Sequence, residues 1–283
     1  MTSPHTKANK AEQPQPPNQP QKGRLILIPN TLDLGCVGGD GQPSAPDLRD
    51  VIPMGALQAA ARLRHWICEN AKTTRAFLKR VNEITPLVAP LQELDLQTLP
   101  RPNKGGQPTK GQPTQEQAAM PALLAPALQG HDIGLISEAG LPAVADPGAA
   151  VVLAAHRAGI SVLPLSGPSS LVLALAGSGL HGQSFAFVGY LPTDAVQRTQ
   201  RIKELEQLSR RHHQTQLVIE TPYRNQALWD ALLAQLHPDT LLSVSCGLTL
   251  ESGFSRTDSV AHWRKQTLTL PSDTPAVFSW LAH

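Results

Sequence analysis

The stretch from Ile133 to Ser170 constrains the fold more than any other part of the chain. It contains two short apolar runs, residues 133–136 and 162–165, separated by a helical segment rich in Ala and Val. A loop of Ser, Gly and Pro residues follows each run. This order predicts a βαβ unit with both loops at the carboxyl ends of parallel strands. Ligands bind at that edge of open α/β sheets, so two such loops predict a cleft, whereas either one alone would indicate only a turn.

The pattern along the rest of the chain predicts an α/β domain followed by a smaller α+β domain. We expect the first at residues 23–180 and the second at 181–283, with the boundary near Leu180. Extended segments are expected at 25–28, 63–68, 87–91, 185–188, 215–220, 241–246 and 276–281. Helices are expected within 47–61 and at 72–81, 117–129, 194–211 and 225–236, the third interrupted by Pro121 and Pro126. Another helix starts near Ser169, whose hydroxyl is a candidate cap.

Composition limits the classes of protein to which the chain belongs. Of its 283 residues 41% are hydrophobic, enough for a sizeable core. The formal net charge of +2 argues against a strongly basic nucleic-acid-binding surface and leaves local basic patches as an alternative. The three cysteines are too scattered for a disulfide framework or a zinc motif, and the histidines lack metal-ligand spacing, so no metal is expected. Residues 1–22 predict a disordered tail without a signal peptide, and residues 100–117 a flexible surface insertion. With no membrane-spanning run, a reducing cytoplasm is the expected location.

A glycine-rich segment at residues 31–39 resembles the D-x-G-x-G-x-G loop of Rossmann-like methyltransferases. Two details argue against that role. Pro29 and Asn30 separate the first predicted strand from Asp33, and Val37 replaces the middle glycine, so its side chain would fill the space a ligand needs. A lone glycine-rich loop is weak support in any case.

Five short motifs occur in order along the chain and carry a family resemblance. They read S-E-A-G-L-P, A-D-P-G, L-S-G-P-S-S, G-Y-L-P and E-T-P-Y-R, at residues 137–142, 145–148, 165–170, 189–192 and 220–224. Together they resemble the tetrapyrrole-methylase superfamily, and within it the branch typified by ribosomal RNA small subunit methyltransferase I. The resemblance covers the chain from about Arg24 onward.

The resemblance implies a two-domain α/β methyltransferase, usually a homodimer, that holds S-adenosylmethionine between its domains and releases S-adenosylhomocysteine. It implies RNA as substrate, through 2′-O-methylation of small-subunit ribosomal RNA. It assigns the cofactor to four groups of residues. These are Pro29; Ser137, Glu138, Ala139, Gly140, Asp146 and Gly148; Ser166, Gly167, Pro168, Ser169 and Ser170; and Thr221, Pro222, Leu248 and Thr249.

Residues that would face the acceptor depart from the family pattern. The family's A-E-D-T-R-x-T-R segment is C-E-N-A-K-T-T-R at residues 68–75, which keeps Glu69 and Arg75 but not the Asp or the first Arg. Glu69 and Glu138 are the candidate catalytic bases, with ribose binding or a structural hydrogen bond as alternatives. Arg75, Tyr223 and Arg224 are candidates for substrate binding.

Other features have plain structural alternatives. Asp146 could serve as a helix N-cap instead of a ligand. The basic residues of 194–211 are interleaved with Glu204 and Glu206, as expected of a solvated helix face, with an RNA-binding face as the alternative. A methyltransferase of a tetrapyrrole or other small molecule, and a non-catalytic cofactor-binding module, stay open as alternative functions.

Overall fold

The computed structural model describes residues 21–33, 46–100 and 115–283, and for 115–117 the backbone only. Most of the tail predicted at 1–22, most of the insertion predicted at 100–117 and the glycine-rich segment beyond Asp33 lie outside these ranges. Residues 115–117 belong to a helix, not to the predicted insertion.

The first half of the chain forms a five-stranded parallel sheet. Its strands are β1 (Arg24–Leu27), β2 (His65–Cys68), β3 (Asp95–Thr98), β4 (Ile133–Ile136) and β5 (Ser161–Pro164), in the order β3-β2-β4-β1-β5. β1 therefore lies between β4 and β5, and the βαβ unit predicted from the sequence crosses over it. As a result, the carboxyl ends of β4, β1 and β5 are neighbours.

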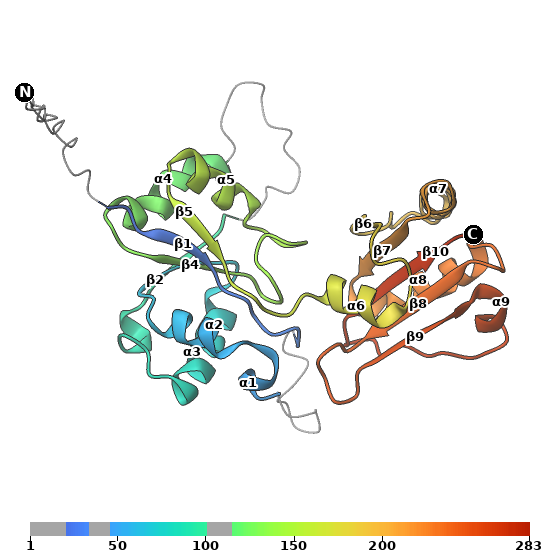
Figure 1. The fold of residues 1–283 in the computed structure, drawn as a ribbon, viewed down its shortest axis with the longest axis horizontal. Coiled ribbons are helices and arrows are strands. Elements are labelled where there is room, and N and C mark those ends of the chain that lie inside the picture. The colour runs from blue at the N-terminus through green and yellow to red at the C-terminus, as the bar shows by residue number, and fades with distance from the viewer. Residues whose placement is uncertain (1–20, 34–45, 101–114) are drawn as a thin grey trace, which may run out of the picture.

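Helices cover both faces of this sheet (Figure 1). On one face lie α1 (Leu48–Val51), α2 (Met54–Ala61) and α3 (Ala71–Ile84), on the other α4 (Gln115–Leu128) and α5 (Ala149–Arg157). Leu25 packs with α4 and α5, whereas Ile26 packs with α2 and α3, as the two-residue period of a strand requires. α4 is a single helix that contains Pro121 and Pro126, so the expected interruption was wrong.

The second half forms a mixed five-stranded sheet. Its strands are β6 (Phe185–Phe187), β7 (Thr215–Glu220), β8 (Leu241–Cys246), β9 (Phe254–Ser259) and β10 (Ala276–Leu281), in the order β6-β7-β10-β8-β9. β6 and β7 are parallel and the other pairs antiparallel. A core containing Trp229, Trp263, Phe278 and Trp280 fills the face covered by α7 (Ala195–His212), α8 (Asn225–Gln235) and α9 (Val260–Trp263).

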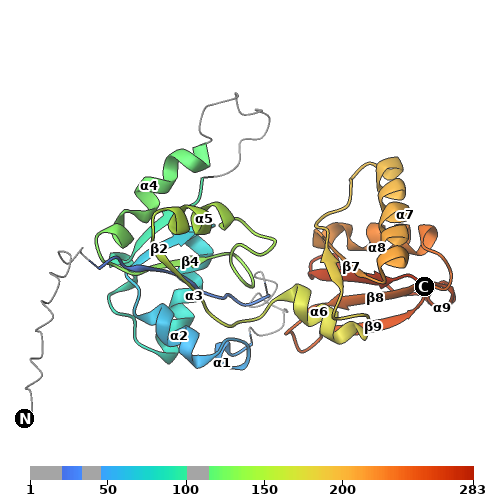
Figure 2. The ribbon, with the colours of Figure 1, turned by 45° about the horizontal axis from the view of Figure 1, so that its top comes forward.

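Helix α6 (Ser170–Ser178) covers the opposite face of the second sheet (Figure 2). Its Leu171, Ala174 and Leu175 pack against Leu217 and Val277 of that sheet. Because α6 shares a core with the second sheet and not the first, we propose that the second unit begins at α6, before Leu180. Ser169 immediately precedes the helix, but its hydroxyl makes no capping hydrogen bond, contrary to expectation.

Two strands were missed and one extended segment was misplaced in the sequence-based prediction. β3 and β9 are edge strands of their sheets, and polar residues predominate in both. The extended segment expected at 87–91 is a loop that leads into a short 3-10 helix, Leu91–Glu93. Sequence patterns find buried strands through continuous apolar runs, a signal that edge strands lack.

Candidate active site

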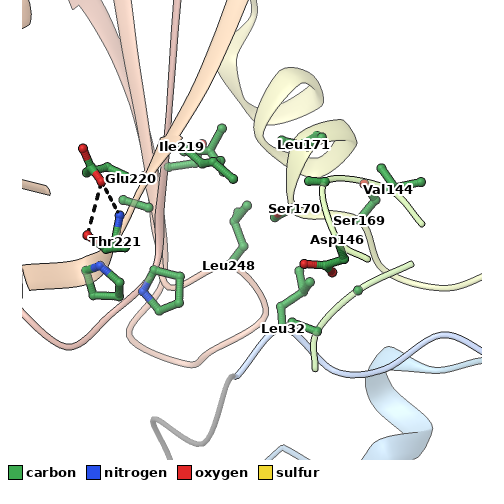
Figure 3. A pocket seen from close by; sticks show the side chains of 18 of the residues that line it. Leu32, Val144, Asp146, Ser169, Ser170, Leu171, Ile219, Glu220, Thr221 and Leu248 are labelled. Atoms are coloured by element: carbon green, nitrogen blue, oxygen red, sulfur yellow. Dashed lines mark hydrogen bonds between the residues drawn. The ribbon is translucent and has the colours of Figure 1, made fainter. Parts of the chain in front are cut away.

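A cavity of about 310 Å³ lies between the two sheets (Figure 3). One wall, the first wall, consists of the loops that follow β1 and β4 together with the start of α6. The other, the second wall, consists of the ends of β7, β8 and β10 and their loops. The described residues that line the cavity are Leu32, Ala139, Gly140, Leu141, Val144, Ala145, Asp146, Ser169, Ser170, Leu171, Tyr190, Ile219, Glu220, Thr221, Pro222, Ser245, Gly247, Leu248, Pro275, Ala276 and Val277.

Asn30 ties the loops of the first wall together. Its backbone N–H donates to the Gly140 carbonyl at 2.9 Å, and Gly140 N–H donates to the Thr31 carbonyl at 3.2 Å. The buried Asn30 side chain also donates to the carbonyls of Ser137 and Glu138, both at 3.0 Å. A buried amide that satisfies two loop carbonyls fixes the spacing of the loops. Asn30 was not among the predicted site residues, because its role is to hold backbone in place.

The loop after β4 holds several residues in left-handed backbone conformations. Gly140 has a φ of 65°, and the non-glycine residues Ala143 and Ala145 have φ values of 67° and 63°. Such conformations are uncommon for residues other than Gly, Asn and Asp, and they concentrate at binding sites. They turn the chain so that Asp146 lies at the cavity.

Glycine is required for a different structural reason at each of three predicted site positions. A Cβ on Gly140 would lie 3.3 Å from Leu32 Cδ2, at the cavity itself. A Cβ on Gly167 would lie 2.1 Å from Pro29 Cβ, so that glycine permits two loops to pack. Gly148 has a φ of 125° and is the N-cap residue of α5. Asp146 therefore does not occupy the N-cap position that was considered for it.

The carboxylates of Asp146, Glu69 and Glu138 lie close together, and Asp146 is the one of the three that lines the cavity. Burial raises the pKa of Asp146 to about 6, and the negative charges of Glu69 and Glu138 add to this, while a hydrogen bond from Ser137 opposes it. Burial likewise raises the pKa of Glu69. Among the described residues, no Lys or Arg forms a salt bridge with any of the three.

The two predicted catalytic glutamates are engaged in hydrogen bonds between loops. Glu138 Oε1 accepts from Asn70 Nδ2 at 2.9 Å and from Thr73 Oγ1 at 3.3 Å. Glu69 Oε2 accepts from the Glu138 backbone N–H at 3.2 Å. Neither residue lines the cavity. This geometry favours the structural alternative for both and draws attention to Asp146.

The second wall is apolar and carries no unpaired charge among the described residues that line it. Ile219, Leu248 and Val277 contribute its aliphatic surface. Glu220 also lines the cavity, but its carboxylate points away and accepts from Thr221 N–H at 2.8 Å (Figure 3). The same carboxylate, 2% exposed, forms a salt bridge of 2.8 Å with Arg224. Arg224, predicted to bind substrate, is therefore occupied by Glu220.

Thr249 follows Leu248 in the tight loop after β8. Its φ is 72°, a left-handed value that is unfavourable for a β-branched residue. Its Oγ1 is buried and has no hydrogen-bond partner in the structure. Burying a hydroxyl without a hydrogen-bond partner costs free energy. A ligand that supplied the partner would offset that cost.

The predicted site residues fall into two groups. Those that line the cavity are Ala139, Gly140, Asp146, Ser169, Ser170, Thr221, Pro222 and Leu248. Those that lie outside its lining are Pro29, Ser137, Glu138, Gly148, Ser166, Gly167, Pro168 and Thr249. Arg75 is exposed on α3, and Tyr223 is 72% exposed beside the cavity-lining Pro222.

Several lining residues were not predicted as site residues. Leu32 and Tyr190 belong to segments with a recognisable family pattern, which was a usable signal. Ile219 and Val277 are apolar strand residues, and nothing in the sequence distinguishes them from core residues. Within the described ranges, no group of three His, Cys, Asp or Glu residues is arranged to hold a metal ion. No helix in the described part is long and apolar enough to cross a membrane.

Comparison with known families identifies the class of protein. Residues 46–252 match the family model described as Tetrapyrrole (Corrin/Porphyrin) Methylases. The match covers most of the chain, and the chain belongs to this family.

Curated relatives narrow the comparison. The chain is 38% identical over 106 residues to "Ribosomal RNA small subunit methyltransferase I" of Halalkalibacterium halodurans, covering 38% of this chain and 35% of that protein. It is 38% identical over 109 residues to the protein of the same name from Vibrio cholerae, covering 38% and 36%. The matched segments thus span about a third of these relatives. A solved uroporphyrin-III-C-methyltransferase from Thermus thermophilus matches 92% of both chains with 19% identity and a TM-score of 0.46.

Proposed function

We propose that this protein is an S-adenosylmethionine-dependent methyltransferase that acts on RNA, on a ribose 2′-hydroxyl of small-subunit ribosomal RNA. The observation that carries the proposal is the cavity between the two sheets of a tetrapyrrole methylase, with carboxylates on one wall and aliphatic residues on the other. The names of the curated relatives support RNA as the acceptor class.

The described residues fit the proposed cofactor. A sulfonium cofactor carries a positive charge and an apolar methylene chain. Asp146, with Glu69 and Glu138 behind it, favours the positive charge, and Leu248 and Ile219 favour the apolar part. The left-handed backbone at Gly140 allows close approach for the rest.

Methyl transfer to a hydroxyl is an in-line displacement for which the bound cofactor supplies the methyl group. The protein's contribution is alignment, exclusion of water and removal of the hydroxyl proton. Among the three carboxylates, Asp146 lines the cavity, and a pKa of about 6 leaves it charged and moderately basic at neutral pH. We assign it the role of proton acceptor, with Glu69 and Glu138 in supporting positions.

The quaternary state and location belong to the same proposal. A homodimer is implied by the family resemblance, and exposed aliphatic side chains, such as Val172 at 57% and Leu173 at 39% exposure, are available on α6. A cytoplasmic location follows from a ribosomal RNA substrate and agrees with the free thiol of Cys68.

Calorimetry with S-adenosylhomocysteine tests the cofactor half of the proposal. Wild-type protein should bind it. Gly140→Val should abolish binding, because a branched side chain at a φ of 65° would crowd Leu32 and the cavity. Gly55→Val, at an exposed helix position where a Cβ meets nothing within 4 Å, is the matched control. Failure of the wild type to bind, or normal binding by Gly140→Val, would contradict the proposed site.

Mass spectrometry of ribosomal RNA from a deletion strain tests the acceptor. A 2′-O-methyl group should be lost and should return with the wild-type gene but not with Asp146→Asn. An unchanged methylation pattern would exclude the RNA assignment and leave the tetrapyrrole or small-molecule alternative. Restoration by Asp146→Asn would show that another group accepts the proton.

A further inference from the structure

The two tyrosines of the chain differ from its four tryptophans in exposure. Tyr190 is 59% exposed and Tyr223 is 72% exposed, whereas all four tryptophans are at most 1% exposed. Tyr190 follows β6 and Tyr223 follows β7, and these two strands are parallel neighbours. Both tyrosines therefore follow the carboxyl ends of neighbouring strands, and the carboxyl end of β7 lines the cavity.

Tyr190 belongs both to the cavity and to the outer surface. It is the only aromatic residue among the described residues that line the cavity, yet more than half of it is exposed. Its position is fixed on both sides. Ile219 N–H donates to the Gly189 carbonyl at 3.2 Å, and Leu191 is buried. A φ of 74° at Gly189 provides the turn that brings the ring to the mouth of the cavity.

The surroundings of Tyr190 are acidic. Burial raises the pKa of its hydroxyl, and Asp146, Glu220 and Glu69 raise it further, so the hydroxyl stays protonated at neutral pH. The negative charge of Asp146, which lines the cavity, opposes the entry of a phosphate group. It does not oppose a neutral planar ring, for which an exposed tyrosine is a good stacking surface.

We propose that Tyr190 determines acceptor specificity by stacking on the base of an unpaired nucleotide, while the phosphates of that nucleotide stay outside the cavity. The proposal rests on the proposed RNA methyltransferase function and deepens it. An acceptor inside a duplex could not place its base against Tyr190, so the substrate class is RNA in which the target nucleotide is unpaired.

Fluorescence anisotropy with labelled oligocytidylate, at saturating S-adenosylhomocysteine, tests the proposal. Tyr190→Ala should weaken binding about 10-fold, the loss expected for one stacked base. Tyr190→Phe keeps the ring and should bind like the wild type. Phe185→Ala removes a 44% exposed aromatic residue at the start of β6, the end of that strand away from Tyr190, and should have no effect.

Calorimetry on the same variants separates the proposal from the cofactor assignment. Because Tyr190 lines the cavity, Tyr190→Ala should lower the affinity for S-adenosylhomocysteine somewhat, but several-fold less than it lowers the affinity for the oligonucleotide. Equal losses of cofactor and oligonucleotide affinity would make Tyr190 a cofactor residue and overturn the proposal. So would unchanged oligonucleotide binding by Tyr190→Ala, or wild-type protein that binds S-adenosylhomocysteine but not oligocytidylate. Failure to bind S-adenosylhomocysteine at all would instead overturn the proposed function.

Discussion

The two walls of the cavity are built in different ways. The first wall is made of loops, with three carboxylates in or beside it, left-handed alanines and a buried asparagine that joins the loops. The second wall is made of strand ends, with aliphatic side chains and a Glu220 carboxylate neutralised by Arg224. The difference indicates that the first wall recognises the charged part of a ligand and that the second wall contacts its apolar part. Four substitutions test this division, in order of expected effect.

Gly167→Ala should have the largest effect of the four substitutions, a loss of stability at the first wall. The new methyl group would lie 2.1 Å from Pro29 Cβ, so one of the two loops must shift. We expect the free energy of unfolding to fall by about 3 kcal/mol in urea titrations, near the upper end for overpacking. Gly182→Ala, where a Cβ meets nothing within 4 Å, should leave it unchanged. Normal stability of Gly167→Ala would show that the first wall is not tightly packed.

Arg224→Ala should weaken the second wall by leaving the Glu220 charge buried without its partner. Because Arg224 itself is 25% exposed, we expect a loss of about 2 kcal/mol in unfolding free energy, below the usual range for a fully buried pair. The double variant Glu220→Gln/Arg224→Met should recover most of it. If Arg224→Ala unfolds like the wild type and loses only RNA affinity, Arg224 is a substrate-binding residue after all.

Asp146→Asn should stabilise the protein at neutral pH. The carboxyl group has a folded-state pKa of about 6 against an ordinary value of 3.8, so the folded state binds the proton more tightly. The charged form is therefore unfavourable for folding above pH 6, and the cost disappears below about pH 4. Allowing for partial exposure, we expect a gain of about 1 to 2 kcal/mol at pH 7 and none at pH 4.

The same variant should lose function while it gains stability. Wild-type methylation should decline as the pH falls through about 6, and Asp146→Asn should be inactive throughout. Urea titrations at the two pH values and initial rates across the range measure both effects. If Asp146→Asn is less stable than the wild type at pH 7, the charged Asp146 carboxylate does not destabilise the folded protein.

Leu248→Ala should have the smallest effect, confined to binding at the second wall. Loss of a partly buried aliphatic side chain corresponds to about 1 kcal/mol, or about fivefold in affinity for S-adenosylhomocysteine. Calorimetry measures it directly. Leu250→Ala, two residues on and outside the cavity lining, is the control. Stronger binding by Leu248→Ala would indicate that the second wall restricts the ligand.

The sequence predicted the elements of the fold better than it predicted the walls. β7, β8 and β10 were predicted with the bounds that they have in the structure, because each is a largely apolar run buried within a sheet. The loops of the first wall were predicted from their small residues. Ile219 and Val277 of the second wall were not predicted, because an apolar strand residue gives the same sequence pattern whether it faces a core or a cavity. Glu220 and Arg224 are adjacent to the cavity, but only the structure reveals that they pair.

Helix α6 begins at the cavity and packs on the second sheet, while the loop before it follows β5 of the first sheet. A ligand that touches both walls therefore contributes to the adhesion of one unit to the other. With a ligand at 100 times its dissociation constant, that contribution is about 2.7 kcal/mol. Heating the protein with and without S-adenosylhomocysteine should consequently show one merged melting transition with the ligand and broader or separate melting of the two units without it.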